Sequence, residues 1–339
     1  MSASTLPYHL RPQKSVDRRL FLDLLNRFER HRSLKNYAYI SMGAYPLEDH
    51  KLVHRLLGVT RLIAFDFSQD IVNRQKFNRP INSCHCFCMK SGELIDNIDD
   101  VLSDANAADC SGIIVWLDYT APSQIGEQIR EFQTLIDRLS ENDLVRITVN
   151  AHPPALGEFK DENGKRLDKL ATRKKRFERL KSRIGDYLQT EITSDHMTDD
   201  YLPLALSGAF GKAASKALPP TSGRSFMPLS IVRYADGHQM LSITGMISKR
   251  TEKEAVWNAL EMSAWPFASK AWNEIHRLFV PDLTLRERMV LDRSVATGSY
   301  AGVAEELGFS FDQDVDLNSF LDNYKDFYRF YPSLLTAEV

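Results

Sequence analysis

The chain has 339 residues, a formal net charge of −2 and 43% hydrophobic residues. This length allows one large domain or two medium ones, and the apolar content is sufficient for a packed core. The near-neutral charge argues against a protein built wholly for nucleic acid, and four cysteines indicate a reducing compartment without a disulfide framework. No apolar run approaches the roughly 20 residues of a membrane span, and the N-terminus has no apolar signal segment. We therefore expect a cytoplasmic protein with no membrane partner.

The first elements are a helical lead-in and the front half of a nucleotide-binding α/β unit. Residues 1–36 form the lead-in, because Arg18–Arg32 carries apolar side chains at helical spacing. The pattern of Tyr39–Pro80 then predicts a strand, a glycine turn, a helix, a strand and a second helix. This order of elements predicts a pocket for a small-molecule cofactor at the carboxyl ends of the strands.

Further strands alternate with helices up to residue 150, and a basic insertion at about 155–223 follows. Beyond the insertion, two alternating runs flank an Asp-Gly pair, which predicts a hairpin. The strands predicted after the first two are Ser83–Lys90, Gly112–Leu117, Leu144–Asn150, Met227–Tyr234 and Gln239–Ser248. The sequence thus predicts an α/β fold over residues 37–250. Its sheet would be doubly wound, mostly parallel and seven-stranded, ending in an antiparallel hairpin, with a helical C-terminal extension at 251–339.

The glycine turn and the acid behind it are the candidate cofactor site. Asp66 lies 23 residues after Gly43, close to the spacing at which an acid reaches a ribose. The turn has one glycine followed by Ala44 and bulky residues, which disfavours NAD or FAD because a pyrophosphate needs close backbone approach. S-adenosylmethionine (SAM) has no phosphate and tolerates such a turn better. Glu48 at the helix start suits a cationic amino group, and Phe67 could lie against adenine; plain structural turns are the alternative.

Two further candidates follow the fourth and fifth strands. Asp118 could act as a base or metal ligand or contact the cofactor, and Tyr119 could line an acceptor pocket. His152 is a candidate general base, because an unshifted histidine titrates near neutral pH. The alternatives are a helix-capping turn at Asp118 and an ordinary loop histidine at position 152.

Two other segments allow two interpretations each. Cys84, Cys86 and Cys88 alternate on a strand, which favours buried free cysteines over a metal site. Lys160–Arg183 holds 11 Lys or Arg against 4 Asp or Glu. This segment could be a basic flap that meets nucleic acid or a phosphate-bearing substrate, or a solvated helix face. The aromatic end, Phe320–Tyr331, predicts packing, homo-oligomer contacts or a partner protein.

Four segments carry a family resemblance: GAYPLEDHKLVHRLLG, FDFSQDIVNRQKFNRP, IVWLDYT and VRITVNAHP. Together they resemble bacterial proteins described as putative O-methyltransferases, within the class I (Rossmann-like) SAM-dependent methyltransferase superfamily. The resemblance covers about residues 30–250. It implies SAM as cofactor, with Gly43 and Asp66 at the SAM pocket and Asp118 beside the acceptor. The Asp118-Tyr119 sequence departs from the Asp/Asn-Pro-Pro-aromatic motif of amine-methylating enzymes, so an oxygen acceptor is expected. A catalytically inactive scaffold that senses a nucleotide, for example in a bacterial defence system, and a nucleic-acid modifying protein are the alternatives.

Overall fold

The computed structural model describes residues 11–297, 302–311 and 316–332. The strands are β1 Tyr37–Ser41, β2 Arg61–Asp66, β3 Cys84–Cys88, β4 Gly112–Asp118, β5 Leu144–Asn150, β6 Arg224–Asp236, β7 His238–Lys249 and β8 His276–Arg277. The helices are α1 Pro12–His31, α2 Glu48–Leu57, α3 Gln69–Asn78, α4 Ser91–Asp96, α5 Ile98–Asp104, α6 Ile125–Arg138, α7 Lys169–Ile184, α8 Leu202–Ala217, α9 Lys253–Ala259, α10 Leu285–Thr297, α11 Val303–Leu307 and α12 Leu317–Phe327.

The strands described form one sheet in the order β3-β2-β1-β4-β5-β7-β6-β8. Neighbouring strands among β1–β5 pair in parallel, and β7 pairs antiparallel with β5. The prediction of an α/β fold with a mostly parallel sheet and antiparallel strands at the end is therefore confirmed. The predicted count of seven strands is wrong, because the described residues form a sheet of eight. The additional strand, β8, has two residues and is too short to give a periodic signal in the sequence.

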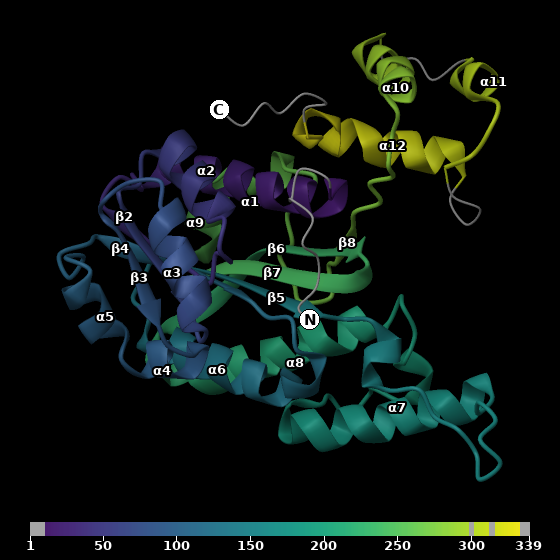
Figure 1. The fold of residues 1–339 in the computed structure, drawn as a ribbon, viewed down its shortest axis with the longest axis horizontal. Helices are drawn as coiled ribbons and strands as arrows, with labels where there is room; N and C mark the ends of the chain where they lie inside the picture. Colours follow the sequence, from purple (N-terminus) through teal and green to yellow (C-terminus); the bar gives the residue numbers. More distant parts are fainter. Residues whose placement is uncertain (1–10, 298–301, 312–315, 333–339) are drawn as a thin grey trace. The chain divides into compact units, whose positions relative to one another are not determined.

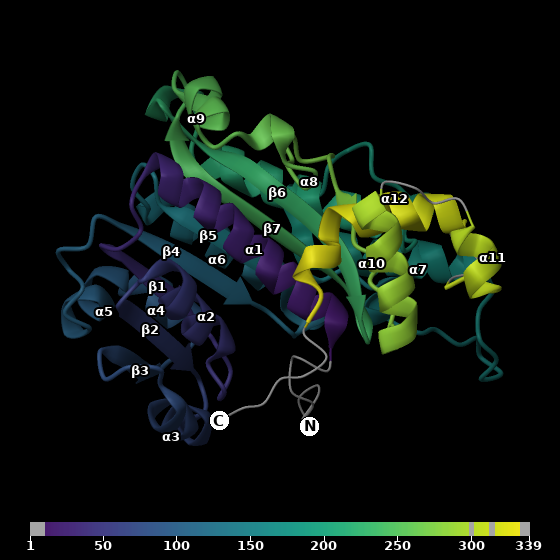
Figure 2. The ribbon, with the colours of Figure 1, turned by 90° about the horizontal axis from the view of Figure 1, so that it is seen from above.

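Helices cover both faces of the sheet because its central strands are apolar on both sides. The interior of β4, Ile113–Leu117, is buried throughout. Figures 1 and 2 show α2 and α3 on one face and α4, α6 and α8 on the other. On the second face, the Phe132 ring of α6 lies 5.2 Å from Phe210 of α8 and 5.3 Å from Phe226 of β6, measured between ring centroids. These aromatic contacts form part of the main core.

The chain divides into two compact units, which we describe separately. The first comprises residues 24–233 and 238–276 and contains most of the sheet. The second comprises the described residues among 11–23, 234–237 and 277–332. The domain boundaries expected at residues 36 and 250 stay predictions.

The aromatic residues near the C-terminus form the interior of the second unit. Tyr324 and Phe327 are fully buried, and their rings lie 5.9 and 6.0 Å from that of Tyr331. The Tyr324 hydroxyl donates to Asp292 of α10 at 2.6 Å, and Arg19 donates to the Tyr331 carbonyl at 2.8 Å. These aromatics therefore hold their own unit together, and contacts of this region with a second copy or a partner protein stay predictions.

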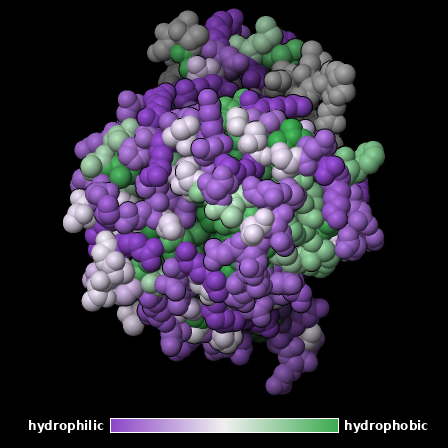
Figure 3. Space-filling view, turned by 90° about the vertical axis from the view of Figure 1, so that its left-hand side faces the viewer, coloured by the Kyte–Doolittle hydropathy of each residue, from purple (hydrophilic) through white to green (hydrophobic). Residues whose placement is uncertain are grey.

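One face of the molecule is mainly polar. On the face shown in Figure 3, hydrophilic residues predominate and hydrophobic residues gather in smaller areas. Among the helices in the described part of the chain, none is long and apolar enough to cross a membrane.

Candidate functional site

Four adjacent strands end at the same edge of the sheet, and a residue predicted for the site lies at or just beyond the end of each. Pairing of Ser41 with Ala64 and Trp116, and of Asp118 with Thr148, aligns the carboxyl ends of β2, β1, β4 and β5. The structure therefore brings Gly43, Asp66, Asp118 and His152 to one edge, where ligands bind in open α/β sheets.

The turn after β1 has an unusual backbone. Gly43, Ala44 and Leu47 have φ values of 64°, 45° and 54°, in the left-handed region. Two of these residues carry side chains, which cost free energy in that conformation. A Cβ atom on Gly43 would lie 2.7 Å from Cε1 of His50, so only glycine fits. Strain of this kind persists only when neighbouring groups impose it, and it concentrates at ligand sites.

Buried polar side chains of β1 and α2 support the turn from below. His50 is fully buried, with Nε2 3.0 Å from the Ile63 carbonyl and Nδ1 3.3 Å from Asp49. The Tyr39 hydroxyl donates to the other Asp49 oxygen at 2.8 Å. Burial opposes protonation of His50, but Asp49 and the Ile63 carbonyl outweigh it and raise its pKa. Glu48, predicted to meet a cationic group, is the half-buried first residue of α2.

Helix α3 supports the same turn from the side. Gln75 is fully buried, and its Nε2 donates to the carbonyls of Met42 and Ala44 at 2.8 and 3.2 Å. Asn78 donates to the Tyr45 carbonyl at 3.1 Å. The turn is thus held on two sides before any ligand binds. Sequence reasoning missed Gln75, because an amide on a helix gives no signal of what it contacts.

Asp66 and Phe67 are placed where a ligand could use them. One Asp66 oxygen accepts from the Ser68 backbone N–H at 2.8 Å, and the other makes no hydrogen bond with the residues that the structure describes. Partial burial raises the pKa of Asp66. The Phe67 side chain is 75% exposed, so its ring offers an uncovered apolar face beside the acid.

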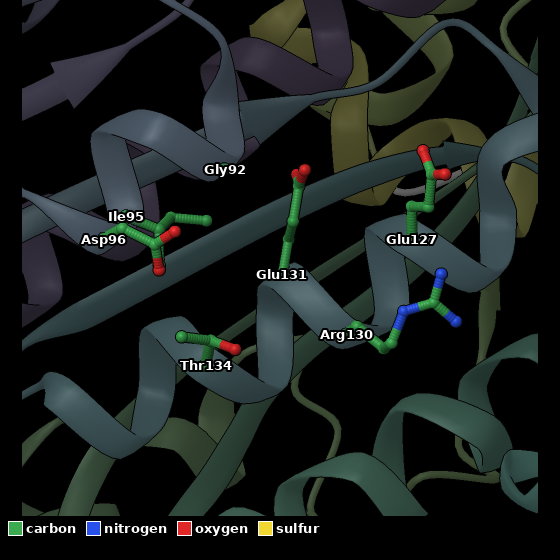
Figure 4. A pocket seen from close by; sticks show the side chains of 7 residues that line it. All are labelled: Gly92, Ile95, Asp96, Glu127, Arg130, Glu131 and Thr134. Atoms are coloured by element: carbon green, nitrogen blue, oxygen red, sulfur yellow. The ribbon is translucent and has the colours of Figure 1, made fainter.

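Tyr119 points toward α6. Its backbone N–H donates to Thr148 at 2.9 Å, its side chain is buried, and its hydroxyl donates to Glu131. Burial and the Glu131 carboxylate raise the pKa of this phenol. Glu131 lines a pocket of about 240 Å³ between α4 and α6, with Asp96 and Glu127 also on its wall (Figure 4). The Tyr119 hydroxyl is therefore already engaged, which weakens its predicted role as an acceptor contact.

His152 stands at the end of β5 in a tight turn. Its backbone N–H donates to Oδ1 of the Asn150 side chain at 2.9 Å. Its Nδ1 lies 3.6 Å from Asp199, beyond a normal hydrogen bond, and its ring centroid is 5.3 Å from that of His238. Burial, with His238 and Arg176 nearby, lowers the His152 pKa, although Asp199 opposes the shift. The lowered pKa favours neutral imidazole, the form that can accept a proton.

A bridging side chain brings the Asp199 loop to β5. Gln239 donates through Nε2 to the Ala151 carbonyl at 3.1 Å and to the Asp199 carbonyl at 2.7 Å. Arg233 of β6 donates to the same Asp199 carbonyl at 2.9 Å and pairs with Asp200 at 2.9 Å. Asp199 was not predicted, because 47 residues separate it from His152 in the sequence.

The basic segment has two faces. Its helical part, α7, begins at Lys169, and its inward arginines hold the loops after β4 and β5. Arg176, Arg179 and Arg183 donate to the carbonyls of Gly157, Leu156 and Pro122 at 3.2, 2.9 and 3.1 Å. The interpretation of Lys160–Arg183 as only a solvated face is therefore incomplete, and nucleic-acid binding by its outer face stays a prediction.

The cysteines of β3 differ in exposure. Cys84 is buried, Cys86 is half-buried and Cys88 is exposed. The expectation that all three are buried is wrong for Cys88, because β3 lies at the edge of the sheet. Among the residues that the structure describes, no group of three or more His, Cys, Asp or Glu side chains could hold a metal ion.

A family model described as "Putative O-methyltransferase" matches residues 6–339. No curated protein matches the chain. Similar solved structures include the plantazolicin methyltransferase BpumL in complex with a pentazolic desmethylPZN analog and SAH, at 11% identity over 68% of this chain and 85% of that chain, with a TM-score of 0.36. The N-methyltransferase NodS from Bradyrhizobium japonicum WM9 is 10% identical over 69% and 97%, with a TM-score of 0.34. A putative S-adenosylmethionine dependent methyltransferase from Listeria monocytogenes is 11% identical over 67% and 98%, with a TM-score of 0.35.

Proposed function

We propose that this chain, which belongs to the putative O-methyltransferase family, transfers a methyl group from SAM to an oxygen atom of an acceptor. We assign the reaction to the predicted methyltransferase domain, residues 37–250. SAM supplies an electrophilic methyl group on a sulfonium centre, and the chain's own residues bind it, orient the acceptor and take up the acceptor's proton.

One observation carries this proposal: the strained turn after β1 and Asp66 at the end of β2 share an edge of the sheet with Asp118 and His152. The turn is rigidly supported and lined by bulky side chains, which suits a cofactor without phosphate better than a dinucleotide. The available oxygen of Asp66 can accept from a ribose hydroxyl, and the exposed ring of Phe67 can cover adenine. The residues present therefore fit SAM.

The remaining residues are assigned by their place along this edge. In the proposal, Gly43 and Ala44 contact the methionine part of SAM, Glu48 balances its ammonium charge, and Asp118 lies between cofactor and acceptor. His152 is the general base for an oxygen acceptor.

SAM binding and turnover test the proposal together. Calorimetry should show SAM binding, and the protein should form S-adenosylhomocysteine (SAH) when an acceptor is present. Asp66→Asn should weaken SAM binding about tenfold or more, because it replaces a charged acceptor of hydrogen bonds by a neutral one. Asp70→Asn is the matched control, since Asp70 is an exposed acid in the first turn of the adjacent helix α3. Absence of SAM binding at millimolar concentration would overturn the proposal.

A further inference from the structure

The segment between β5 and α8 begins with a long stretch that polar contacts hold in place. The structure describes all of residues 157–179, and none of them is buried. Within this stretch, the half-buried Phe177 packs against the main core. Elements with few buried apolar side chains belong to the least stable parts of a fold, from which moving parts are drawn. The position of the N-terminal part of α7 therefore depends on a small number of hydrogen bonds.

The C-terminal end of α7 is anchored. Its buried residues, Leu180 and Ile184, both lie in the last five positions of the helix. A Cβ atom on Gly126 of α6 would lie 2.1 Å from the Arg183 carbonyl oxygen, so the backbones of the two helices pack directly against each other. Gly185 follows with a φ of 52°, a conformation that glycine adopts without a steric cost. A motion of α7 would pivot about this end.

Two arginines fasten the N-terminal part of α7 to the turn that follows β5. Arg176 donates through Nε to the Gly157 carbonyl at 3.2 Å, and Arg179 donates through Nη1 to the Leu156 carbonyl at 2.9 Å. The guanidinium carbon of Arg179 also lies 4.6 Å from the centroid of the Phe159 ring. Arg179 is exposed and Arg176 is half-buried, so water can replace either carbonyl as the partner.

The arrangement leaves no room for an acceptor on this side of His152. The hollow beside His152 is walled by the turn after β5, by the start of α6, by Leu180 of α7 and by two leucines of α8, Leu202 and Leu206. Its free space is about 10 Å³, which holds roughly one water molecule. A larger molecule can therefore reach His152 through the hollow only after one of these walls has moved.

We propose that α7 is a lid on the acceptor side of the site. It pivots about its anchored C-terminal end, and Arg176 and Arg179 latch it closed. Opening releases the two carbonyls of the turn after β5 and withdraws Leu180 from the hollow, which gives the acceptor a path to His152. Closure then keeps water away from the methyl transfer. The role of the lid in admitting an acceptor rests on the proposed function, whereas its motion does not.

Thiol labelling of a cysteine placed in the hollow tests the lid. Leu206→Cys replaces a side chain that is 2% exposed, in a protein whose Cys86, Cys88 and Cys110 are changed to serine. The new thiol should react with iodoacetamide only while α7 is open, so the rate reports the population of the open form. Arg179→Gln should raise the rate about tenfold, because the latch loses a charge-assisted hydrogen bond. Arg179→Lys keeps a charged donor and should raise it less.

Two controls separate opening of the lid from a general loosening of the fold. Ala213→Cys places the thiol at a buried position of the same helix, α8, outside the hollow. Its labelling should stay slow when Arg179→Gln is added. Lys181→Gln changes an exposed cation of α7 and should leave the labelling rate of Leu206→Cys as it was.

The outcomes separate the lid from the proposed function. Equal labelling of Leu206→Cys with and without Arg179→Gln overturns the lid, and so does a rate that rises equally at Ala213→Cys. Either result leaves the methyltransferase proposal standing. Faster labelling of Leu206→Cys alone, in a protein that does not bind SAM, supports the motion of α7 and overturns the proposed function.

Discussion

The two halves of the candidate site are built differently. The cofactor half comes from residues 39–78, close together in the sequence, and its supports are buried: Tyr39, Asp49, His50 and Gln75. The acceptor half joins residues 150–157, 176, 199 and 238–239, and its side chains are partly exposed. The cofactor half is thus fixed before binding, whereas the acceptor half depends on contacts between distant segments.

This difference has a functional meaning. A buried, supported turn suits a cofactor that is always the same. The turn is already ordered in the folded protein, so binding does not have to supply the free energy for ordering it. A partly exposed half, held by loop contacts, can vary without disturbing the core. Changes in the cofactor half should therefore affect stability and SAM binding together, whereas changes in the acceptor half should affect only the reaction.

The largest effect is expected from Gly43→Ala. The new methyl group would clash with His50 and occupy a left-handed backbone position, at a cost of about 2–4 kcal/mol in the free energy of unfolding. SAM affinity should fall at least about tenfold because the turn must move. Denaturant unfolding and calorimetry measure the two effects.

Gly58→Ala is the matched control for this change. Gly58 has a φ of 68°, but a Cβ atom there would meet nothing within 4 Å. Its cost should be only about 1 kcal/mol of backbone strain, with SAM affinity unchanged. Equal SAM affinity in both variants would show that the turn does not contact the cofactor.

Gln75→Met should have the next largest effect. The change leaves the carbonyls of Met42 and Ala44 without their donor, which costs about 1–3 kcal/mol. SAM affinity should fall several-fold, because the turn loses its lateral support. Gln69→Met, at an exposed position of α3, should change neither stability nor binding. A Gln75→Met protein that is less stable but binds SAM normally would separate the support of the turn from cofactor binding.

Asp199→Asn should change the acceptor half alone. In the proposed reaction neutral His152 accepts the proton, so kcat/KM should fall as the pH drops through the His152 pKa. The Asp199 carboxylate raises that pKa, and the variant should therefore shift the acidic limb of the pH profile to lower pH. The plateau should fall a few-fold through poorer orientation, with SAM affinity unchanged. Asp195→Asn, an exposed acid in the same loop, should leave the profile in place; a limb that stays fixed in Asp199→Asn contradicts the assigned role.

The smallest effect is a pH dependence of stability from His50. Its folded pKa is raised, so its contribution is fully present below the ordinary histidine pKa of about 6.5 and is lost as the pH rises through the folded value. The free energy of unfolding should therefore decline as the pH rises above about 6.5 toward the raised pKa of His50. His50→Gln should remove this part of the slope, and an unchanged slope would show that the pair is not ionised.

The sequence predicted the elements that local patterns determine. The strand β4, the hairpin and the position of Asp66 all follow from apolar runs, turn residues and spacing within short segments. The edge strand β8 was missed because two residues are too few to show an alternation of apolar and polar side chains. In the acceptor half, Asp199 and Arg176 were not associated with His152, because nothing in a single sequence pairs residues that tertiary contacts bring together.

The direction of Tyr119 was also beyond the sequence. The apolar run before Tyr119 predicts its position after β4. The sequence does not predict the side-chain rotamer, which directs the hydroxyl to Glu131, twelve residues later on α6. The orientation of the arginines in the basic segment Lys160–Arg183 was likewise not predicted. The sequence shows how many charges the segment carries, whereas the inward direction of Arg176, Arg179 and Arg183 follows only from the packing of α7.

A crystal structure with SAH tests the central claim most directly. The account predicts SAH at the carboxyl edge of the sheet, with a ribose hydroxyl on the available oxygen of Asp66 and the sulfur between the Gly43 turn and Asp118. SAH bound instead in the acid-lined pocket between α4 and α6, with Asp66 uncontacted, would contradict it.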